Sequence, residues 1–215
     1  MELSPKGYAL IFGVLHLLYL FIGLSSPNLI QQTIFYLLLY DGAILGGFMI
    51  FGLDFVEKYK LNKGYLAGLL IGVVIAEILV LIELGFYGVF SYTIPYPFKE
   101  AIRGYFYLII VAFVIGNSEE VFFRGFLPAI VEKYGKDERD IKVGKYILAP
   151  AIFGISHYFA WANSVYNDIF TTIYVFMYHF TFGVAMQFLT DTYDSLYPAI
   201  ICHTVYDATK MIMMV

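Results

Sequence analysis

The sequence predicts an all-α fold: a polytopic bundle of about seven transmembrane helices, with six to eight as the range. The chain has 215 residues, of which 60% are hydrophobic and only 14% are charged. Ordinary soluble domains are about 45–50% apolar and about 25% charged. Several continuous apolar runs also approach the ~20 residues that a membrane-spanning helix needs. Continuous runs favour helices over the alternating strands of a membrane barrel.

The expected spans follow one another along the chain with polar breaks between them. They cover residues 8–24, 32–52, 65–90, 100–134, 145–161, 169–189 and 196–215. The fourth is too long for one perpendicular span. We expect it to break near Gly116, where Asn117 or Ser118 would cap a new segment. No repeat or linker divides the chain, so residues 1–215 are expected to form a single integral-membrane domain.

Basic residues gather in two of the expected loops. Three lysines follow the second span, at positions 58, 60 and 63, and five basic residues lie between positions 133 and 145. The positive-inside rule places both loops in the cytoplasm, with the N-terminus, and places the C-terminus outside. No basic stripe exists and the pI is about 5.5, which excludes a nucleic-acid-binding protein. The single cysteine, Cys202, excludes an intrachain disulfide.

Ionisable residues inside the expected spans are candidates for function. Each costs about 2.5–3.5 kcal/mol at mid-membrane on insertion scales, and such residues are usually functional. The candidates include all four histidines: His16, Asp41, Glu77, Glu83, Glu119, Glu120, Arg124, His157, His179, His203 and Asp207.

Helical spacing groups some of these candidates. Glu120 and Arg124 are four residues apart and form an internal ion pair on one helix face. His203 and Asp207 have the same spacing, so the carboxylate can orient the imidazole. At 1.5 Å per residue, Glu120, His157 and His203 lie at similar depths from the cytoplasmic side. His179, Asp41 and Glu77 pass the same depth test, so depth alone selects no site.

Three motifs resemble those of a known family, the CPBP intramembrane proteases, which include the type II CAAX prenyl endopeptidases and bacteriocin-processing enzymes. Glu119 to Arg124 matches EExxxR, Phe153 to His157 matches FxxxH, and His203 to Asp207 matches HxxxB, where B is Asn or Asp. The resemblance covers about residues 103–210, the expected catalytic half of the chain.

The resemblance implies hydrolysis of a peptide bond inside the membrane. Glu119 and His157 would activate a water, and Glu120 and Arg124 would support the site. His203 and Asp207 would line the oxyanion side, although an ionised Asp207 repels an oxyanion and must then be protonated, paired or used for orientation. The implied partners are membrane lipids and a peptide or prenylated protein as substrate, with an active site open to the cytoplasm.

Two mechanisms stay open for such a site. A buried carboxylate near an imidazole can act as a general base. Alternatively, Glu119, His157 and His203 could hold a divalent metal such as zinc, with an open position for water.

Other classes of function make different demands on the sequence. No His-Glu pair is present, so a HExxH zinc protease is absent. A proton- or ion-coupled transporter would use Asp41, Glu77 and Glu83, but no inverted repeat supports it. A non-catalytic scaffold or immunity protein would tolerate loss of the motifs. Outside the motifs, we expect polar residues such as His16 and His179 to make helix contacts.

Overall fold

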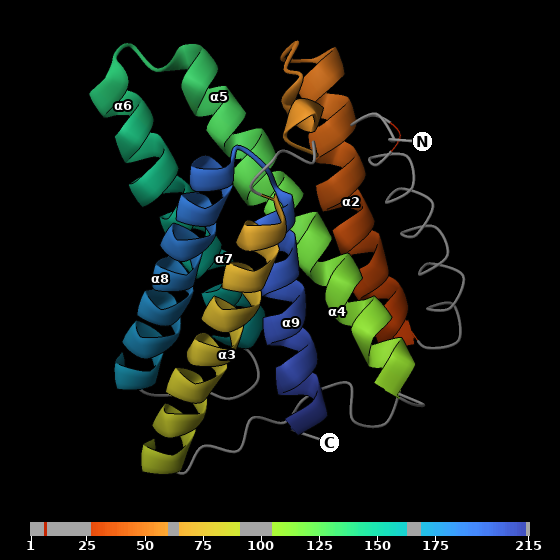
Figure 1. Cartoon of the computed structure of the whole chain (residues 1–215), viewed down its shortest axis with the longest axis vertical. Helices are drawn as coiled ribbons and strands as arrows, with labels where there is room; N and C mark the ends of the chain where they lie inside the picture. Colours follow the sequence, from red (N-terminus) through yellow and green to blue (C-terminus); the bar gives the residue numbers. More distant parts are fainter. Residues whose placement is uncertain (1–6, 8–26, 60–64, 91–104, 163–168, 214–215) are drawn as a thin grey trace.

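The computed structural model describes residue 7 and residues 27–59, 65–90, 105–162 and 169–213. Within these ranges the regular structure is entirely helical, as predicted (Figure 1). In chain order, the elements are α2 (Pro27–Met49), the 3₁₀ helix η1 (Phe55–Tyr59), α3 (Tyr65–Phe90), α4 (Tyr105–Glu120), the π-helix η2 (Val121–Phe126), α5 (Leu127–Tyr134), α6 (Glu138–Val143), the π-helix η3 (Gly144–Leu148), α7 (Ala149–Ala162), α8 (Ile169–Tyr193) and α9 (Tyr197–Met213).

Helix positions agree closely with three of the expected spans. α3 has the predicted bounds, and α8 and α9 begin within one residue of the predicted starts. The expected first span, residues 8–24, lies outside the described residues together with His16. The side chain of Glu83 also lies outside them.

The expected break near Gly116 is wrong. α4, η2 and α5 follow one another without interruption from Tyr105 to Tyr134. Ser118 caps no helix, because its hydroxyl donates to the Val114 carbonyl at 2.7 Å within the same helix. Asn117 is likewise inside α4, where it accepts a hydrogen bond from Tyr59 at 3.3 Å.

Prolines explain the two π-helical turns. Pro128 comes two residues after η2 and Pro150 two residues after η3. A proline inside a helix lacks the N–H group and clashes with the carbonyl four residues earlier, which a locally wider turn relieves. Accordingly, the residue before each proline donates its N–H five residues back, from Leu127 to Phe122 and from Ala149 to Gly144.

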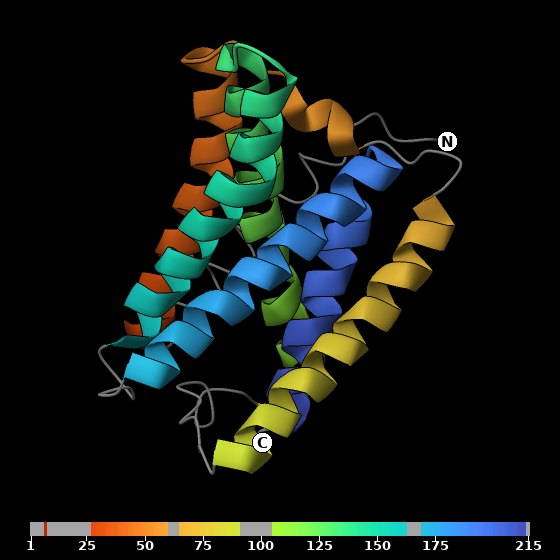
Figure 2. The same ribbon diagram turned by 90° about the vertical axis from the view of Figure 1, so that its left-hand side faces the viewer.

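Two sets of helix contacts bring the three motifs together. α9 packs against both α3 and α4, and α7 packs along α8 (Figures 1 and 2). A buried aromatic and aliphatic cluster joins these helices, with Phe123, Phe153, Phe182 and Met186 among its members. The helix pairs that carry the three motifs are therefore held together by one apolar core.

The helices differ in whether they are long and apolar enough to cross a membrane. Among the described residues, one helix, Thr172–Tyr193, is long and apolar enough to cross a membrane, with 39% of its apolar window buried inside the protein. Leu66–Ile82 is apolar but shorter. The expected number of about seven spans, and the orientation of the chain, stay predictions.

Candidate active site

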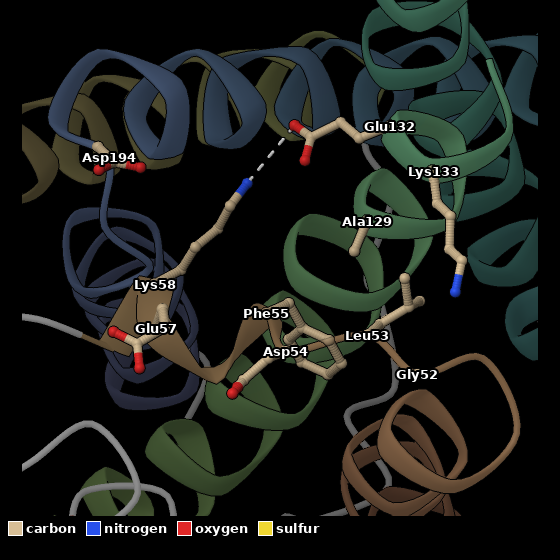
Figure 3. Close-up of a pocket in the computed structure, with 10 residues that line it drawn as sticks. All are labelled: Gly52, Leu53, Asp54, Phe55, Glu57, Lys58, Ala129, Glu132, Lys133 and Asp194. Carbon is tan, nitrogen blue, oxygen red and sulfur yellow. Dashed lines mark ion pairs between the residues drawn. The ribbon is translucent and has the colours of Figure 1, made fainter. Parts of the chain in front are cut away.

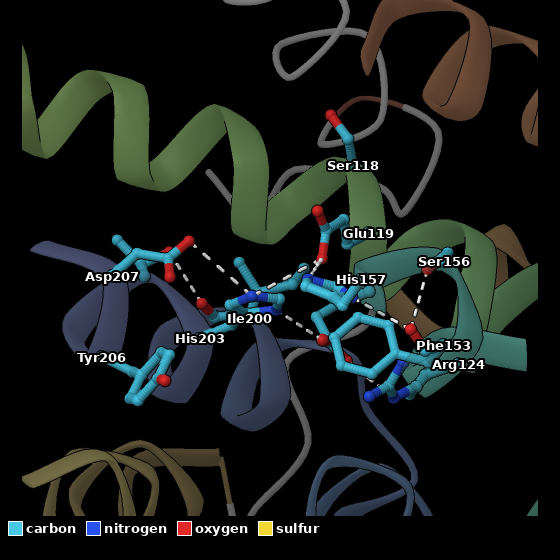
Figure 4. A network of polar contacts seen from close by, with 12 residues as sticks. Ser118, Glu119, Arg124, Phe153, Ser156, His157, Ile200, His203, Tyr206 and Asp207 are labelled. Carbon is cyan, nitrogen blue, oxygen red and sulfur yellow. Dashed lines mark hydrogen bonds and ion pairs between the residues drawn. The ribbon is translucent and has the colours of Figure 1, made fainter. Parts of the chain in front are cut away.

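All six residues expected at the site lie in one network of polar contacts (Figure 4). The last two residues of α4 supply Glu119 and Glu120, and η2 supplies Arg124. α7 supplies His157, and α9 supplies His203 with Asp207 one turn further on. Side chains from three separate stretches of sequence thus meet between α4, α7 and α9.

Glu119 lies at the centre of this network. Its Oε2 atom is 3.6 Å from Nε2 of His157 and 3.7 Å from Nε2 of His203. Both distances exceed a normal hydrogen bond, and this buried oxygen has no hydrogen-bond partner among the described residues. A buried polar atom without a partner is costly, and a gap of this size between polar atoms suits a bridging water.

The tautomer of His157 follows from its backbone contact. Nδ1 of His157 lies 3.0 Å from the carbonyl oxygen of Phe153, one turn earlier in α7. A carbonyl only accepts, so Nδ1 carries the proton. In the neutral ring, Nε2 is then a lone-pair acceptor, and it faces the carboxylate oxygen of Glu119. Two acceptors face each other across 3.6 Å.

His203 is held from its other ring nitrogen. Nδ1 lies 2.7 Å from Oε1 of Glu120, and both groups are buried. Nδ1–H of His203 therefore donates a hydrogen bond to the carboxylate of Glu120. Nε2 of His203 lies 3.7 Å from Oδ2 of Asp207. This nitrogen thus lies at the same distance from two carboxylates, those of Glu119 and Asp207.

Glu120 and Arg124 form a buried ion pair beside the site. Nε of Arg124 is 3.1 Å from Oε2 of Glu120, and the two side chains are 2% and 0% exposed. The guanidinium carbon also lies 4.6 Å from the ring centre of Phe153, within the range of a cation–π contact. Arg124 therefore compensates Glu120 and packs on the FxxxH motif, which links two of the three motifs.

A close approach of α4 and α9 allows these contacts. A Cβ atom at Gly116 would lie 3.1 Å from the backbone nitrogen of Thr204 and 3.2 Å from Cβ of His203. No larger residue fits there without displacing α9. The glycine lies one turn before Glu119 and Glu120, so it sets the distance between these carboxylates and His203.

Polar candidates outside the motifs are mostly separate from this network. Asp41 is half-buried in α2, and Glu77 is exposed on α3, where it accepts a hydrogen bond from Thr209 at 3.1 Å. Cys202 is buried in the apolar core, as expected for a packing residue. His179 differs from these, because its ring stacks on that of His157 with 4.1 Å between centres. The expected helix contact of His179 is thus made with a residue of the site.

The expected metal ligands do not form a coordination set. Among the described residues, no three His, Cys, Asp or Glu side chains are grouped so that they could hold a metal ion. The two imidazoles approach the same oxygen of Glu119, and His203 uses Nδ1 for Glu120.

A hollow lies at the junction of η1 and α5, and none of the six site residues lines it (Figure 3). It has a volume of about 420 Å³. Lys58 and Glu132 approach within 3.8 Å across it. Its lining is Gly52, Leu53, Asp54, Phe55, Glu57, Lys58, Ala129, Glu132, Lys133 and Asp194.

Comparison with known proteins identifies the family of this chain. The family model described as type II CAAX prenyl endopeptidase, Rce1-like, matches residues 101–209, about half of the chain. The chain belongs to this Rce1-like family. All six site residues lie inside the matched range. No curated protein and no solved structure matches the chain in the same comparisons.

Family membership confirms the broad functional expectations. An Rce1-like protein is a membrane-embedded protease, and hence a hydrolase. Its family implies a peptide or prenylated-protein substrate in a membrane.

Proposed function

We propose that this chain is an intramembrane endopeptidase of the CAAX prenyl type, in which Glu119 and His157 activate a water at a membrane-embedded site open to the cytoplasm. One observation carries the proposal. The unpartnered Oε2 atom of Glu119 and the acceptor Nε2 of His157 face each other across 3.6 Å. A single water can donate one hydrogen to each of these atoms.

A water held in this way has its lone pairs free for attack. Its oxygen bonds to the carbonyl carbon of the peptide while one of its protons passes to Glu119 or His157. The carbonyl oxygen becomes an oxyanion. When the tetrahedral intermediate collapses, the C–N bond breaks and the stored proton moves to the leaving amine. The products are a carboxylic acid, which still carries the second proton of the water, and an amine. The two bases return to their starting states, and loss of the remaining acid proton to bulk water leaves the carboxylate.

His203 supplies the positive partner for the oxyanion. Three carboxylates surround its ring, from Glu119, Glu120 and Asp207. These charges favour a doubly protonated imidazole, which donates from Nε2. A donor preorganised in a site shielded from water stabilises the charge that develops on the carbonyl oxygen. Asp207 then acts by orienting His203 and not by contacting the oxyanion.

Cleavage by purified protein tests the proposal. Detergent-purified protein is incubated with a farnesylated CAAX peptide and a peptide library, next to Glu119→Ala and His157→Ala variants. We expect cleavage by the wild type and losses on the order of 10²–10⁴-fold in both variants. Equal inactivity of all three proteins on every peptide would overturn the proposal and favour a non-catalytic role.

Chelation tests the metal-free form of the mechanism. Wild-type protein is dialysed against a strong chelator until metal analysis finds no bound zinc. We expect cleavage to continue at its original rate. Activity that disappears on chelation and returns with zinc would instead assign a metal to the site.

A further inference from the structure

His179 has no place in the three motifs, yet it lies against the proposed base. The rings of His157 and His179 are 4.1 Å apart between centres and 20° from parallel. Phe153 lies 4.3 Å from the centre of the His157 ring at an angle of 54°. The imidazole of His157 is therefore enclosed by Phe153 and His179.

The backbone hydrogen bond of His157 does not by itself fix the orientation of the ring. The hydrogen bond from Nδ1 to Phe153 fixes the tautomer, but one hydrogen bond allows the ring to rock about it. The side chain is 19% exposed, more than the other residues that contact Glu119. Packing on the ring faces is what restrains the direction in which Nε2 points.

His179 is itself held firmly. Its Nδ1 lies 2.8 Å from the carbonyl oxygen of Val175, one turn earlier in α8. Tyr178 contacts its ring edge-on, with 5.5 Å between centres. His157 and His179 thus have matching tautomers, each defined by the carbonyl four residues back, and matching ring planes.

Close packing of α7 and α8 sets the stacking distance. A Cβ atom at Gly154 would lie 3.0 Å from the carbonyl oxygen of Phe176 on α8. A Cβ atom at Gly183 would lie 3.0 Å from Cβ of Pro150 on α7. Both glycines lie on the Pro150 side of the stacked pair along the helices, and they let the backbones approach closely.

We propose that His179 is a positioning residue for His157: its stacked ring keeps Nε2 of His157 directed at Oε2 of Glu119. The inference rests on the proposed hydrolytic function. His179 acts through its ring face and exchanges no proton with the substrate. A flat aromatic side chain should therefore replace it, whereas a small side chain should not.

Two variants separate this role from the alternatives. His179→Phe keeps a stacked ring and removes both nitrogens, and His179→Ala removes the ring. We expect His179→Ala to lower kcat for peptide cleavage on the order of ten- to hundredfold with little change in KM, because small misplacements of a catalytic group have effects of this size. His179→Phe should stay within about threefold of the wild type in kcat. Circular dichroism and size-exclusion profiles show whether each variant folds.

A second readout is independent of catalysis. Diethylpyrocarbonate acylates accessible imidazole nitrogens, and peptide mass spectrometry follows His157 separately from the other three histidines. We expect His157 to react faster in His179→Ala than in the wild type, and at the wild-type rate in His179→Phe. If the wild type cleaves no peptide, the proposed function fails while this comparison still decides whether His179 restrains His157.

Three results would overturn the inference. His179→Ala with wild-type kcat and an unchanged acylation rate would show that the stack restrains nothing. His179→Phe as inactive as His179→Ala would show that the imidazole itself is needed. A folded His179→Phe in which His157 reacts as fast as in His179→Ala would show that ring packing is not the cause.

Discussion

Nδ1 of His203 lies 2.7 Å from Oε1 of Glu120, while the second oxygen of the same carboxylate lies 3.1 Å from Nε of Arg124. One buried carboxylate thus joins the last motif to the first. The two glutamates of the pair have different surroundings. Both oxygens of Glu120 lie within 3.1 Å of a nitrogen, whereas Oε2 of Glu119 lies 3.6 Å and 3.7 Å from the nitrogens of its two histidine neighbours.

The pairing of Glu120 predicts a large loss of stability when it is broken. Glu120→Gln leaves the guanidinium of Arg124 buried without a counter-ion, which typically costs about 3–5 kcal/mol. Arg124→Met should be costly for the complementary reason. The double variant should lose less than the sum of the two single losses, because neither charge is then left alone. Thermal unfolding in detergent measures the three differences, and strict additivity would contradict the pairing.

Substitution of Glu119 should have the opposite effect to substitution of Glu120: stability should be kept and activity lost. Glu119→Gln removes a buried charge whose Oε2 atom has no hydrogen-bond partner among the described residues, so we expect an unfolding temperature equal to or above that of the wild type. Peptide cleavage should fall on the order of 10²–10⁴-fold, because an amide cannot act as the base. Glu120→Gln is the matched control, one residue away. A large loss of stability in Glu119→Gln would contradict the assignment of the two roles.

Local spacing could be read from the sequence, but contacts between helices could not. The four-residue spacings predict the Glu120–Arg124 pair and the nearness of His203 and Asp207. Which glutamate pairs with His203 depends on how α4 is rotated about its axis against α9. That rotation follows from the approach of Gly116 to His203 and Thr204, which lie 87 and 88 positions further along the chain.

The expected break inside the fourth helix failed for a related reason. Gly116, Asn117 and Ser118 are typical of a helix boundary, and this local signal predicted a break. Burial of the segment outweighed it, because Asn117 and Ser118 find partners without leaving the helix. The wide turn at η2 carries a sequence signal, Pro128, but a proline allows a kink, a break or a π-turn, and only packing decides among them.

A lysine far from the site predicts a structural role for the segment that joins α5 to η3. Lys145 is 11% exposed and lies 2.6 Å from Asp191 and 2.9 Å from Glu132, so it ties α5, η3 and α8 together. Lys145→Met keeps the aliphatic stem but should cost about 1.5–3 kcal/mol, the range for hydrogen bonds to charged groups.

Lys142 offers a matched control three residues away. It pairs with Glu138 at 2.6 Å, but both side chains are largely exposed, at 69% and 82%. Lys142→Met should therefore leave the unfolding temperature nearly unchanged, because water screens exposed pairs. Equal unfolding temperatures for the Lys145→Met and Lys142→Met variants would show that the buried network does not stabilise the bundle.

The approach of α4 to α9 predicts that one methyl group will disturb the site. In Gly116→Ala, the new Cβ would lie 3.1 Å from the backbone nitrogen of Thr204 and 3.2 Å from Cβ of His203. α9 must then shift by a few tenths of an ångström. His203 moves away from both glutamates, so we expect kcat to fall on the order of ten- to hundredfold.

Gly42→Ala is the control for this substitution, since Gly42 also lies inside a helix but has no atom within 4 Å of a built Cβ. Alanine there should raise stability by about 0.5–1 kcal/mol and leave cleavage unchanged. Peptide cleavage and unfolding temperature are measured for both variants. If Gly116→Ala cleaves as fast as Gly42→Ala, the contact at Gly116 does not set the distance between the glutamates and His203, and another contact between α4 and α9 must do so.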